Sequence, residues 1–362
     1  MSAHMFAGAS TPMGFVDLFD NILPVDEARA RLFLKGSSGS GKSTFMKKVA
    51  TRFETRGISV ERFHCANDAQ SLDAIMIPSI GLSIVDATSP HAHDPEIAIA
   101  IDRILDFAQF IDKSKLEPHL GELKSLSANK KLLAKKVTGY LAAIGNMYDV
   151  SNSAFENALD KHAIKNCANQ YLNEIMQYAQ AGVQNNKGRS RKLFLSALTP
   201  DGFVSYADKL FEDCKIYGIS CDIGYGANIF LEELRDLAIP HGINVTSFYN
   251  PLSPERVEYL YFPQISTAFV RTDGSFAYTE DIDKEVGLNN YINKETLEAV
   301  SVLEPDCGMF DRVLDKAVSA MYCARKLHAR TEEIYVSAMD FDALNRVSED
   351  VIQGLLELID NN

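Results

Sequence analysis

The sequence lacks three patterns that would each indicate a particular class of protein. Its six cysteines are scattered without a Cys-x-x-Cys pair, which argues against a zinc site and a disulfide framework. No stretch approaches the roughly 18 consecutive apolar residues of a membrane-spanning helix. No charged and then apolar leader opens the sequence. We therefore expect a cytoplasmic protein with reduced thiols and no membrane partner.

Positive charge is also scarce, because 36 lysines and arginines face 49 aspartates and glutamates, for a net charge of −13. An acidic surface repels a phosphate backbone, which argues against nucleic acid as a partner. Apolar residues make up 46% of the 362 residues, enough to bury one large core or two of ordinary size. We therefore expect two domains.

An internal repeat organises the chain. Residues 39–87 align without a gap with residues 224–272 and share ten identical positions, whereas chance would give about three. Upstream, residues 6–16 match residues 194–204, and both contain Thr-Pro-x-Gly-Phe-Val. The repeat extends to a helical end, where Ala158 and Asp160 match Ala338 and Asp340. The chain is therefore interpreted as two copies of one module.

The polar run at residues 184–191 predicts the boundary, so residues 1–188 form the first module and residues 189–362 the second. In each copy the predicted order is a strand, a helix, a strand, a glycine turn, a second helix and two further strands. The predicted strands are residues 5–9, 31–35, 59–64 and 82–86, then residues 192–197, 215–221, 244–249 and 267–271. This order predicts an α/β fold of tandem duplicated parallel-sheet modules with ligand at the carboxyl ends of the strands. Apolar residues at helical spacing over residues 96–182 predict long inserted helices.

The segment Gly36-Ser37-Ser38-Gly39-Ser40-Gly41-Lys42-Ser43 fits the phosphate-binding loop pattern called Walker A. Glycines let backbone N–H groups approach a triphosphate closely, and a helix from about residue 42 to 56 points its positive end at the phosphates. Lys42 is expected to neutralise the β- and γ-phosphates, and Ser43 to coordinate Mg²⁺. Thr44 either adds a hydroxyl to the α-phosphate or is only a first-turn helix residue. The segment predicts a P-loop NTPase fold that binds a nucleotide, with ATP and Mg²⁺ as the expected pair.

The second magnesium ligand should be an acid at the end of a neighbouring apolar strand. Asp86 closes the strand predicted at residues 82–86 and fits this description, although turns also favour aspartate at such a position. The next residues contain His91 and His93, which we interpret as loop residues with satisfied side chains rather than as a zinc pair. Asp86 is therefore our candidate for both magnesium binding and catalysis.

A further polar cluster, residues 64–68, follows the second predicted strand at the same edge of the sheet. Asp68 in this cluster has two interpretations. Its carboxylate could orient a water or a substrate hydroxyl, or Asn67 and Asp68 could cap the next helix. The sequence leaves the two alternatives open, and Asp68 is kept as a candidate catalytic residue.

The second copy keeps core residues such as Phe63, which is Phe248 there, but loses the chemical groups. The replacements are Ala227 for Lys42, Asn228 for Ser43, Ile229 for Thr44, Ser253 for Asp68 and Arg271 for Asp86. The second module is therefore predicted to be degenerate and not to bind ATP with magnesium in the usual way. Asp68 and Asp86 are lost together with Lys42, which strengthens their assignment as catalytic residues. Asp73 is only changed to another acid, Glu258.

Taken together, the motifs at residues 34–48, 63–73 and 84–95 resemble an uncharacterised bacterial family of tandem-repeat P-loop ATPases. The resemblance covers nearly the whole chain, and Thr199-Pro200-Asp201-Gly202-Phe203 resembles the start of the family's second repeat. Gly224-Tyr225-Gly226-Ala227-Asn228 departs from an intact phosphate loop, so a mechanism with two active sites is not expected. The resemblance implies ATP binding and hydrolysis and names no substrate.

The leading functional hypothesis is a magnesium-dependent ATPase in which hydrolysis at the first module changes its contact with the second module or with a protein or small-molecule partner. Arg256 or Arg271 of the second copy could complete the site as an arginine finger. One alternative is a small-molecule kinase. This is less favoured because Arg103 is the only arginine within residues 96–182. A second alternative is an ATP-sensing scaffold with negligible turnover.

Overall fold

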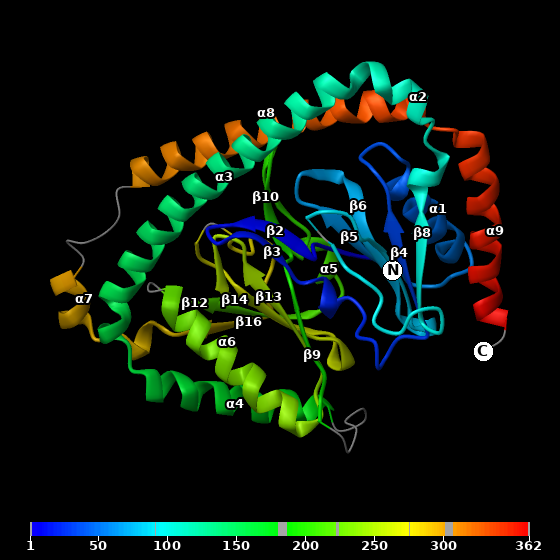
Figure 1. Cartoon of the computed structure of the whole chain (residues 1–362). Coiled ribbons are helices and arrows are strands. Elements are labelled where there is room, and N and C mark those ends of the chain that lie inside the picture. Colours follow the sequence, from blue (N-terminus) through cyan, green and yellow to red (C-terminus); the bar gives the residue numbers. More distant parts are fainter. Residues whose placement is uncertain are drawn as a thin grey trace.

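The computed structural model describes residues 2–90, 92–179, 187–221, 224–274, 276–300 and 307–360. Over these residues the chain forms two six-stranded, mostly parallel mixed sheets flanked by helices, which is an α/β architecture (Figure 1). Within the same ranges, no helix combines the length and the apolar character that crossing a membrane requires.

The first sheet has the strand order β1-β5-β6-β7-β4-β8. Its strands are β1 (Ala3–Met5), β4 (Ala30–Lys35), β5 (Glu61–Cys65), β6 (Asp68–Ile77), β7 (Leu82–Asp86) and β8 (Asp102–Asp106). Neighbouring strands are parallel except that β6 runs antiparallel to β5 and β7. The prediction of a fully parallel sheet is therefore wrong at β6. Residues 74–77 of this strand are all buried, so no alternation of polar and apolar residues marks it as a strand.

The second sheet repeats the same order as β9-β13-β14-β15-β12-β16. Its strands are β9 (Ser190–Leu193), β12 (Lys215–Ser220), β13 (Val245–Asn250), β14 (Ser253–Phe262), β15 (Thr267–Arg271) and β16 (Lys284–Gly287). The irregularities repeat as well, because the register shifts between Phe63 and His64 and again between their counterparts Phe248 and Tyr249. The two copies therefore share one topology.

A β-hairpin follows the first strand of each copy, where the sequence predicted a helix. The first hairpin pairs β2 (Gly8–Thr11) with β3 (Gly14–Asp17), and the second pairs β10 (Ser196–Thr199) with β11 (Gly202–Ser205). The repeated Thr-Pro-x-Gly forms the turn, in which the threonine hydroxyl donates to the glycine carbonyl at 2.8 Å and 2.9 Å. Both of these glycines have positive φ angles, 102° and 97°, which a helix does not allow.

Helices flank both sheets and then extend beyond them. They are α1 (Lys42–Glu54), α2 (Lys113–Leu116), α3 (Leu120–Phe155), α4 (Lys161–Ala179), α5 (Ala207–Leu210), α6 (Gly224–Ala238), α7 (Lys294–Val300), α8 (Cys307–Ala338) and α9 (Phe341–Asp360). The predicted long helices are present as α3 and α4, but the helical interpretation of residues 97–108 is wrong, because β8 and the 3₁₀ helix η3 (Phe107–Phe110) lie there. The Asp102 carboxylate holds this segment at the sheet edge by accepting hydrogen bonds from Arg31 and from the amides of Glu96 and Ile97.

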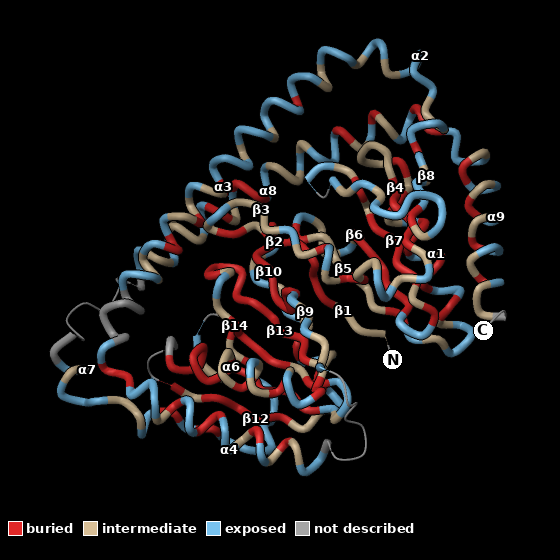
Figure 2. The backbone as a smooth tube through the Cα atoms, turned by 60° about the horizontal axis from the view of Figure 1, so that its bottom comes forward, coloured by how far each residue is buried: buried red, intermediate tan, exposed pale blue. Residues whose placement is uncertain are grey.

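The last helix of each half packs against the sheet of the other half. Helix α4 lies against α6, and its Ile164 and Leu172 are part of the core of the second sheet. Helix α9 lies against α1, and its Leu344 and Ile352 are part of the core of the first sheet. The long helices α3 and α8, which lead to these two, run side by side (Figure 1) and are exposed along most of their length (Figure 2). The halves separated at residue 188 are therefore intertwined in the fold.

The two copies are joined at Phe6 and Phe194, which are counterparts in the repeat. The amide of Phe6 donates to the Phe194 carbonyl at 2.8 Å, and the amide of Phe194 donates back to Phe6 at 3.0 Å. Arg191 also crosses the junction, with two hydrogen bonds to Glu61 at 3.0 Å and 2.8 Å. Because equivalent residues bond to each other, the junction has approximate two-fold symmetry.

A histidine pair at this junction predicts a pH-dependent stability. His4 Nδ1 lies 2.8 Å from His64 Nε2, and the ring of Tyr206 from the second copy lies 4.6 Å from the His64 ring. Burial lowers the pKa of His64 to about 4. The unfolded chain takes up this proton near pH 6.5, so the free energy of unfolding should fall as the pH drops from about 6.5 to about 4, by on the order of 3 kcal/mol.

Urea unfolding at about pH 7 and about pH 4.5 measures this fall. The matched variant is His64→Tyr, because tyrosine is the residue at the counterpart position, Tyr249. The variant should lose less stability on acidification than the wild type. An equal loss in both proteins would contradict the assignment to His64.

Candidate functional site

The glycine-rich segment at residues 36–43 forms the turn between β4 and α1, at the carboxyl end of a central strand of the first sheet. Gly39 and Gly41 have φ angles of 74° and 92°, in the left-handed region that other residues rarely adopt. Gly41 is the N-cap of α1, so the first amides of this helix point toward the sheet edge without helical partners. The turn therefore presents the positive end of α1 at the carboxyl edge of the sheet.

Lys42 is buried within this turn. Its Nζ donates to the carbonyls of Gly36 and Ser37 at 3.0 Å and 2.8 Å, and lies 3.5 Å from Oδ2 of Asp86. The candidate phosphate ligand and the candidate magnesium ligand are therefore close together. Within the described chain, the hydroxyls of Ser37 and Ser40 are buried and have no hydrogen-bond partner. Such hydroxyls are suited to a polar ligand, because a buried polar group without a partner is costly.

Ser43 makes a hydrogen bond that its counterpart preserves. Its Oγ accepts the amide of Leu72 at 2.9 Å, and Oδ1 of Asn228 accepts the amide of Val257 at 2.8 Å. Leu72 and Val257 are counterparts, so an oxygen at this position ties the helix to the neighbouring strand in both copies. The Ser43 oxygen keeps a second lone pair for a metal ion. Of the remaining loop candidates, the side chain of Ser38 is half-buried, whereas that of Thr44 is exposed.

Asp86 lies beside a second buried acid, Asp73, which the sequence analysis left out of the candidate set. Ala74 pairs with Val85 in the β6–β7 register, so Asp73 and Asp86 occupy the adjoining positions just beyond this pair. Asp73 is 7% exposed. Burial raises the pKa of Asp86, Lys42 and Thr88 oppose this rise, and the charge of Asp73 adds to it. The sequence signal for Asp73 is that its counterpart in the second copy, Glu258, is also an acid. A residue with a purely structural role would give the same signal.

The oxygen atoms of Ser43, Asp73 and Asp86 suit Mg²⁺ chemically, because this ion prefers oxygen ligands. In the ranges that the structure describes, no group of three or more His, Cys, Asp or Glu side chains could hold a metal ion by itself. A magnesium ion that binds together with ATP takes most of its ligands from phosphate and water. The residues present therefore fit Mg²⁺ bound with a nucleotide rather than a metal held by protein side chains alone.

Asp68 lies at the same edge of the sheet, at the start of β6. Its carboxylate accepts hydrogen bonds from the amide of Gln70 at 3.2 Å and from the hydroxyl of Ser71 at 2.6 Å. A strand follows Asp68, so the alternative in which Asn67 and Asp68 cap a helix is wrong. Asp68 instead closes the turn between β5 and β6, and its proposed contact with water or substrate stays a prediction.

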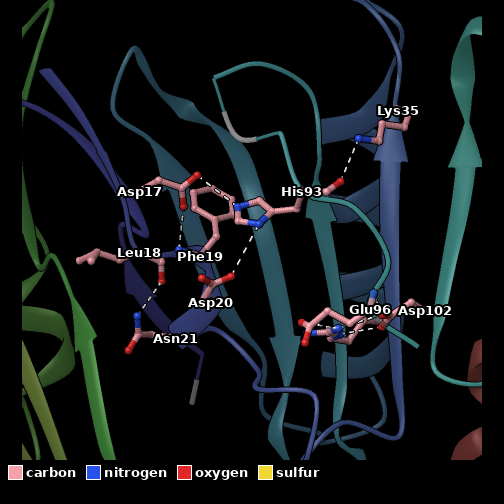
Figure 3. Close-up of polar contacts among 10 residues, drawn as sticks. Asp17, Leu18, Phe19, Asp20, Asn21, Lys35, His93, Glu96 and Asp102 are labelled. Carbon is pink, nitrogen blue, oxygen red and sulfur yellow. Dashed lines mark hydrogen bonds and ion pairs between the residues drawn. The ribbon is translucent and has the colours of Figure 1, made fainter. Parts of the chain in front are cut away.

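The loop after Asp86 is held in place on both sides (Figure 3). Lys35 donates to the carbonyls of Ala87 and His93 at 2.8 Å and 2.9 Å. The His93 ring lies 3.1 Å from a carboxylate oxygen of Asp17 and 3.7 Å from one of Asp20, and the hydrogen bond to Asp17 raises the pKa of His93. The interpretation of His93 as a satisfied loop residue fits these contacts, whereas His91 lies outside the described residues. The loop thus links the β2–β3 hairpin region to the strand that carries the phosphate loop.

At the positions equivalent to Asp73 and Asp86, the second copy has a buried ion pair. Arg271 lies 3.4 Å from Glu258, with side chains only 5% and 3% exposed, and it also bonds to Asp273. Arg256 lies 3.4 Å from Asp149 and over the ring of Tyr148, both on α3. Arg256 and Arg271 are therefore engaged in the second half, and the hypothesis that either serves the first copy as an arginine finger is not supported by these contacts.

Helices α8 and α9 from the second half cover the phosphate loop of the first. A Cβ atom on Gly39 would lie 2.9 Å from the carbonyl oxygen of Glu332 and 3.1 Å from Val336, and one on Gly41 would lie 3.1 Å from Leu344. Side chains at these two loop positions would therefore push against the covering helices. The candidate site is built from both halves of the chain.

The fold and the site together define an α/β protein with a polar, charged centre at the carboxyl edge of its first sheet. No family model, curated protein or solved structure gives a significant match to this chain. Its function is therefore inferred from the site geometry.

Proposed function

We propose that the chain is a P-loop protein that binds ATP with Mg²⁺ at its first copy and hydrolyses the ATP. Hydrolysis would change the contact between the first copy and the second half, or a partner. The observation that carries the proposal is the buried Lys42, 3.5 Å from Asp86, in a glycine turn at the positive end of α1. The proposal agrees with what the resemblance to tandem-repeat P-loop ATPases implies.

The acids near Lys42 support the proposal. Asp86 lies 3.5 Å from Lys42, and the charge of Asp73 beside it adds to the rise in the pKa of Asp86. At the position of Asp86 the second copy has Arg271, which pairs with Glu258. The first copy therefore offers carboxylate oxygens to a divalent cation at a place where the second copy has a positive charge. Ser43 and Asp86, with Asp73 beside them, are the residues that would hold Mg²⁺.

Each residue then has a role in the reaction. Lys42 exchanges the carbonyls of Gly36 and Ser37 for the β- and γ-phosphates, and the first amides of α1 hold phosphate oxygens. Bound Mg²⁺ supplies further neutralisation of the phosphates. Asp68 or Asp86 orients the attacking water. Its oxygen bonds to the γ-phosphorus while the bond to the bridging oxygen breaks, which yields ADP and phosphate and releases the proton of the water to solvent.

Phosphate release from ATP and Mg²⁺ by the purified full chain tests the proposal. Turnover without an added acceptor is the expected result. Turnover only after a hydroxyl-bearing metabolite is added would indicate the kinase alternative. Binding of ATP without turnover under any condition would indicate the sensing scaffold, and absence of binding would refute all three.

A further inference from the structure

Helix α8 brings a face of the second half over the carboxyl edge of the first sheet. Its end is fixed there, because the carbonyl of Ala338 accepts the amide of Asp112 at 2.9 Å and the amide of Asp340 donates to Phe110 at 2.8 Å. Glu332 lies against Gly39 of the phosphate loop. Residues seven positions apart lie on the same face of a helix, about 10 Å apart, so Arg325 lies on the face that carries Glu332. The α8 face that covers the candidate site therefore carries an arginine.

Arg325 is held at the tip of the β10–β11 hairpin. Its guanidinium bonds to both carboxylate oxygens of Asp201, at 2.5 Å and 2.9 Å, and Asp201 lies in the turn of this hairpin. The hydrogen bond to Asp201 raises the pKa of Arg325, and the charges of Asp201 and, more weakly, of Asp68 in the first copy add to this rise. The Arg325 side chain is 31% exposed, so it is not locked in a core.

The approximate two-fold symmetry gives an independent comparison. Asp160 and Asp340 each accept an amide at the start of the following helix, at 2.9 Å, which confirms the alignment of α3 with α8 at this end. The same alignment makes Gly145 the counterpart of Arg325. A Cβ atom on Gly145 would lie 2.8 Å from Pro12 and 3.8 Å from the carbonyl of Leu252. This position on the long helix thus lies at a hairpin tip in both halves, and on α3 it also lies next to the turn before β14.

The residues at the two helix positions, Gly145 and Arg325, differ in parallel with the phosphate-loop residues of the two copies. Glycine occupies this position on α3, which lies against the second copy, whereas arginine occupies it on α8, which covers the copy that keeps Lys42 and Asp86. The residues that follow Gly145 on α3 contact the second sheet, because the Arg256 guanidinium lies over the Tyr148 ring and 3.4 Å from Asp149. Side chains of α3 therefore reach β14, the counterpart of β6.

We propose that Arg325 is the second positively charged residue of the nucleotide site, supplied to the first copy by the second half. It would exchange Asp201 for the γ-phosphate and neutralise charge as the phosphoryl group transfers to water. This inference rests on the proposed ATPase function. It also explains how turnover is coupled to the second half, because the arginine must release the β10–β11 hairpin when it engages the nucleotide.

Steady-state ATP hydrolysis by three variants of the full chain tests the inference. Arg325→Ala should lower kcat by about 1,000-fold with little change in KM or in ATP-induced stabilisation, as expected for a residue that acts in the transition state. Asp201→Asn breaks the same ion pair but keeps the arginine, so it should retain turnover. Arg330→Ala is the matched control, because Arg330 lies on the same helix and is paired with Glu122 of α3.

The outcomes separate the two proposals. If Arg325→Ala retains kcat within about threefold of the wild type, Arg325 is not part of the site, although the ATPase assignment stands. If Asp201→Asn loses as much activity as Arg325→Ala, the ion pair is only a structural link between α8 and the hairpin, and the inference is wrong. A wild-type protein that hydrolyses no ATP would overturn both proposals.

Discussion

Lys42→Ala is expected to abolish the stabilisation that ATP and Mg²⁺ give to the wild-type protein. A ligand present at 100 times its Kd stabilises a protein by about 2.7 kcal/mol, so the lost effect is large enough to measure by thermal unfolding. Phosphate release should fall by about 100-fold or more, because the removed charge acts on the transferring phosphoryl group. The physical reason is the position of Lys42, which is buried at the end of the phosphate loop beside Asp86.

The matched control for this experiment is Lys47→Ala. Lys47 lies on the same helix, α1, but its side chain is exposed. This variant should keep both the ATP-induced stabilisation and the turnover of the wild type. Equal stabilisation of Lys42→Ala and the wild type by ATP would show that the loop does not bind the triphosphate.

Arg271→Ala is expected to destabilise the protein without ATP by about 3–5 kcal/mol, the usual cost of removing one partner of a buried ion pair. Glu258 would then lose its oppositely charged partner in a place where both side chains of the pair are almost fully buried, and it would keep the hydrogen bond from Asn250 at 2.9 Å. Burial already raises the pKa of Glu258, which shows how unfavourable its charge is at this position. Chemical denaturation of the purified variant measures the loss of free energy of unfolding.

A second substitution tests whether this loss is electrostatic. Glu258→Gln in the Arg271→Ala background removes the uncompensated charge and should recover part of the lost stability, because the two residues are coupled. Glu258→Gln alone, which leaves Arg271 with Asp273, should cost less than Arg271→Ala. A double variant that is less stable than Arg271→Ala would contradict the view that the second copy neutralises its own acid.

The candidate loop could be found in the sequence because its chemistry is local. A turn that needs left-handed residues requires glycine, so Gly39 and Gly41 mark it directly, and Lys42 follows at a fixed spacing. The repeat could also be found, since it rests on aligned core residues such as Phe63 and Phe248. Asp73 cannot be recognised from the sequence, because an acid within a buried strand has the same sequence pattern whether it binds a ligand or a neighbouring charge.

The strand β6 and the β2–β3 hairpin could not be predicted from periodicity. Residues 74–77 are buried without alternation, because strands pair with β6 on both sides and both of its faces are covered. One face packs in the core with α1 and α9, and the other packs in a core shared with the second sheet, so the pattern of a half-exposed strand is missing. A hairpin replaces the predicted helix because Thr-Pro-x-Gly is a turn sequence, in which the threonine hydroxyl donates to the glycine carbonyl.

The sequence by itself determined the duplication, the glycine turn and which copy keeps the charged residues, because each depends on residue identity at short spacing. Only the tertiary structure decided that α4 and α9 exchange sheets and that α8 covers the phosphate loop. An amphipathic helix needs an apolar surface to cover, and its sequence does not state which of two similar sheets supplies that surface. The connection through α3 and α8, which are long enough to reach the other half, settles this choice and puts Arg325 on the helix that covers the phosphate loop of the first copy.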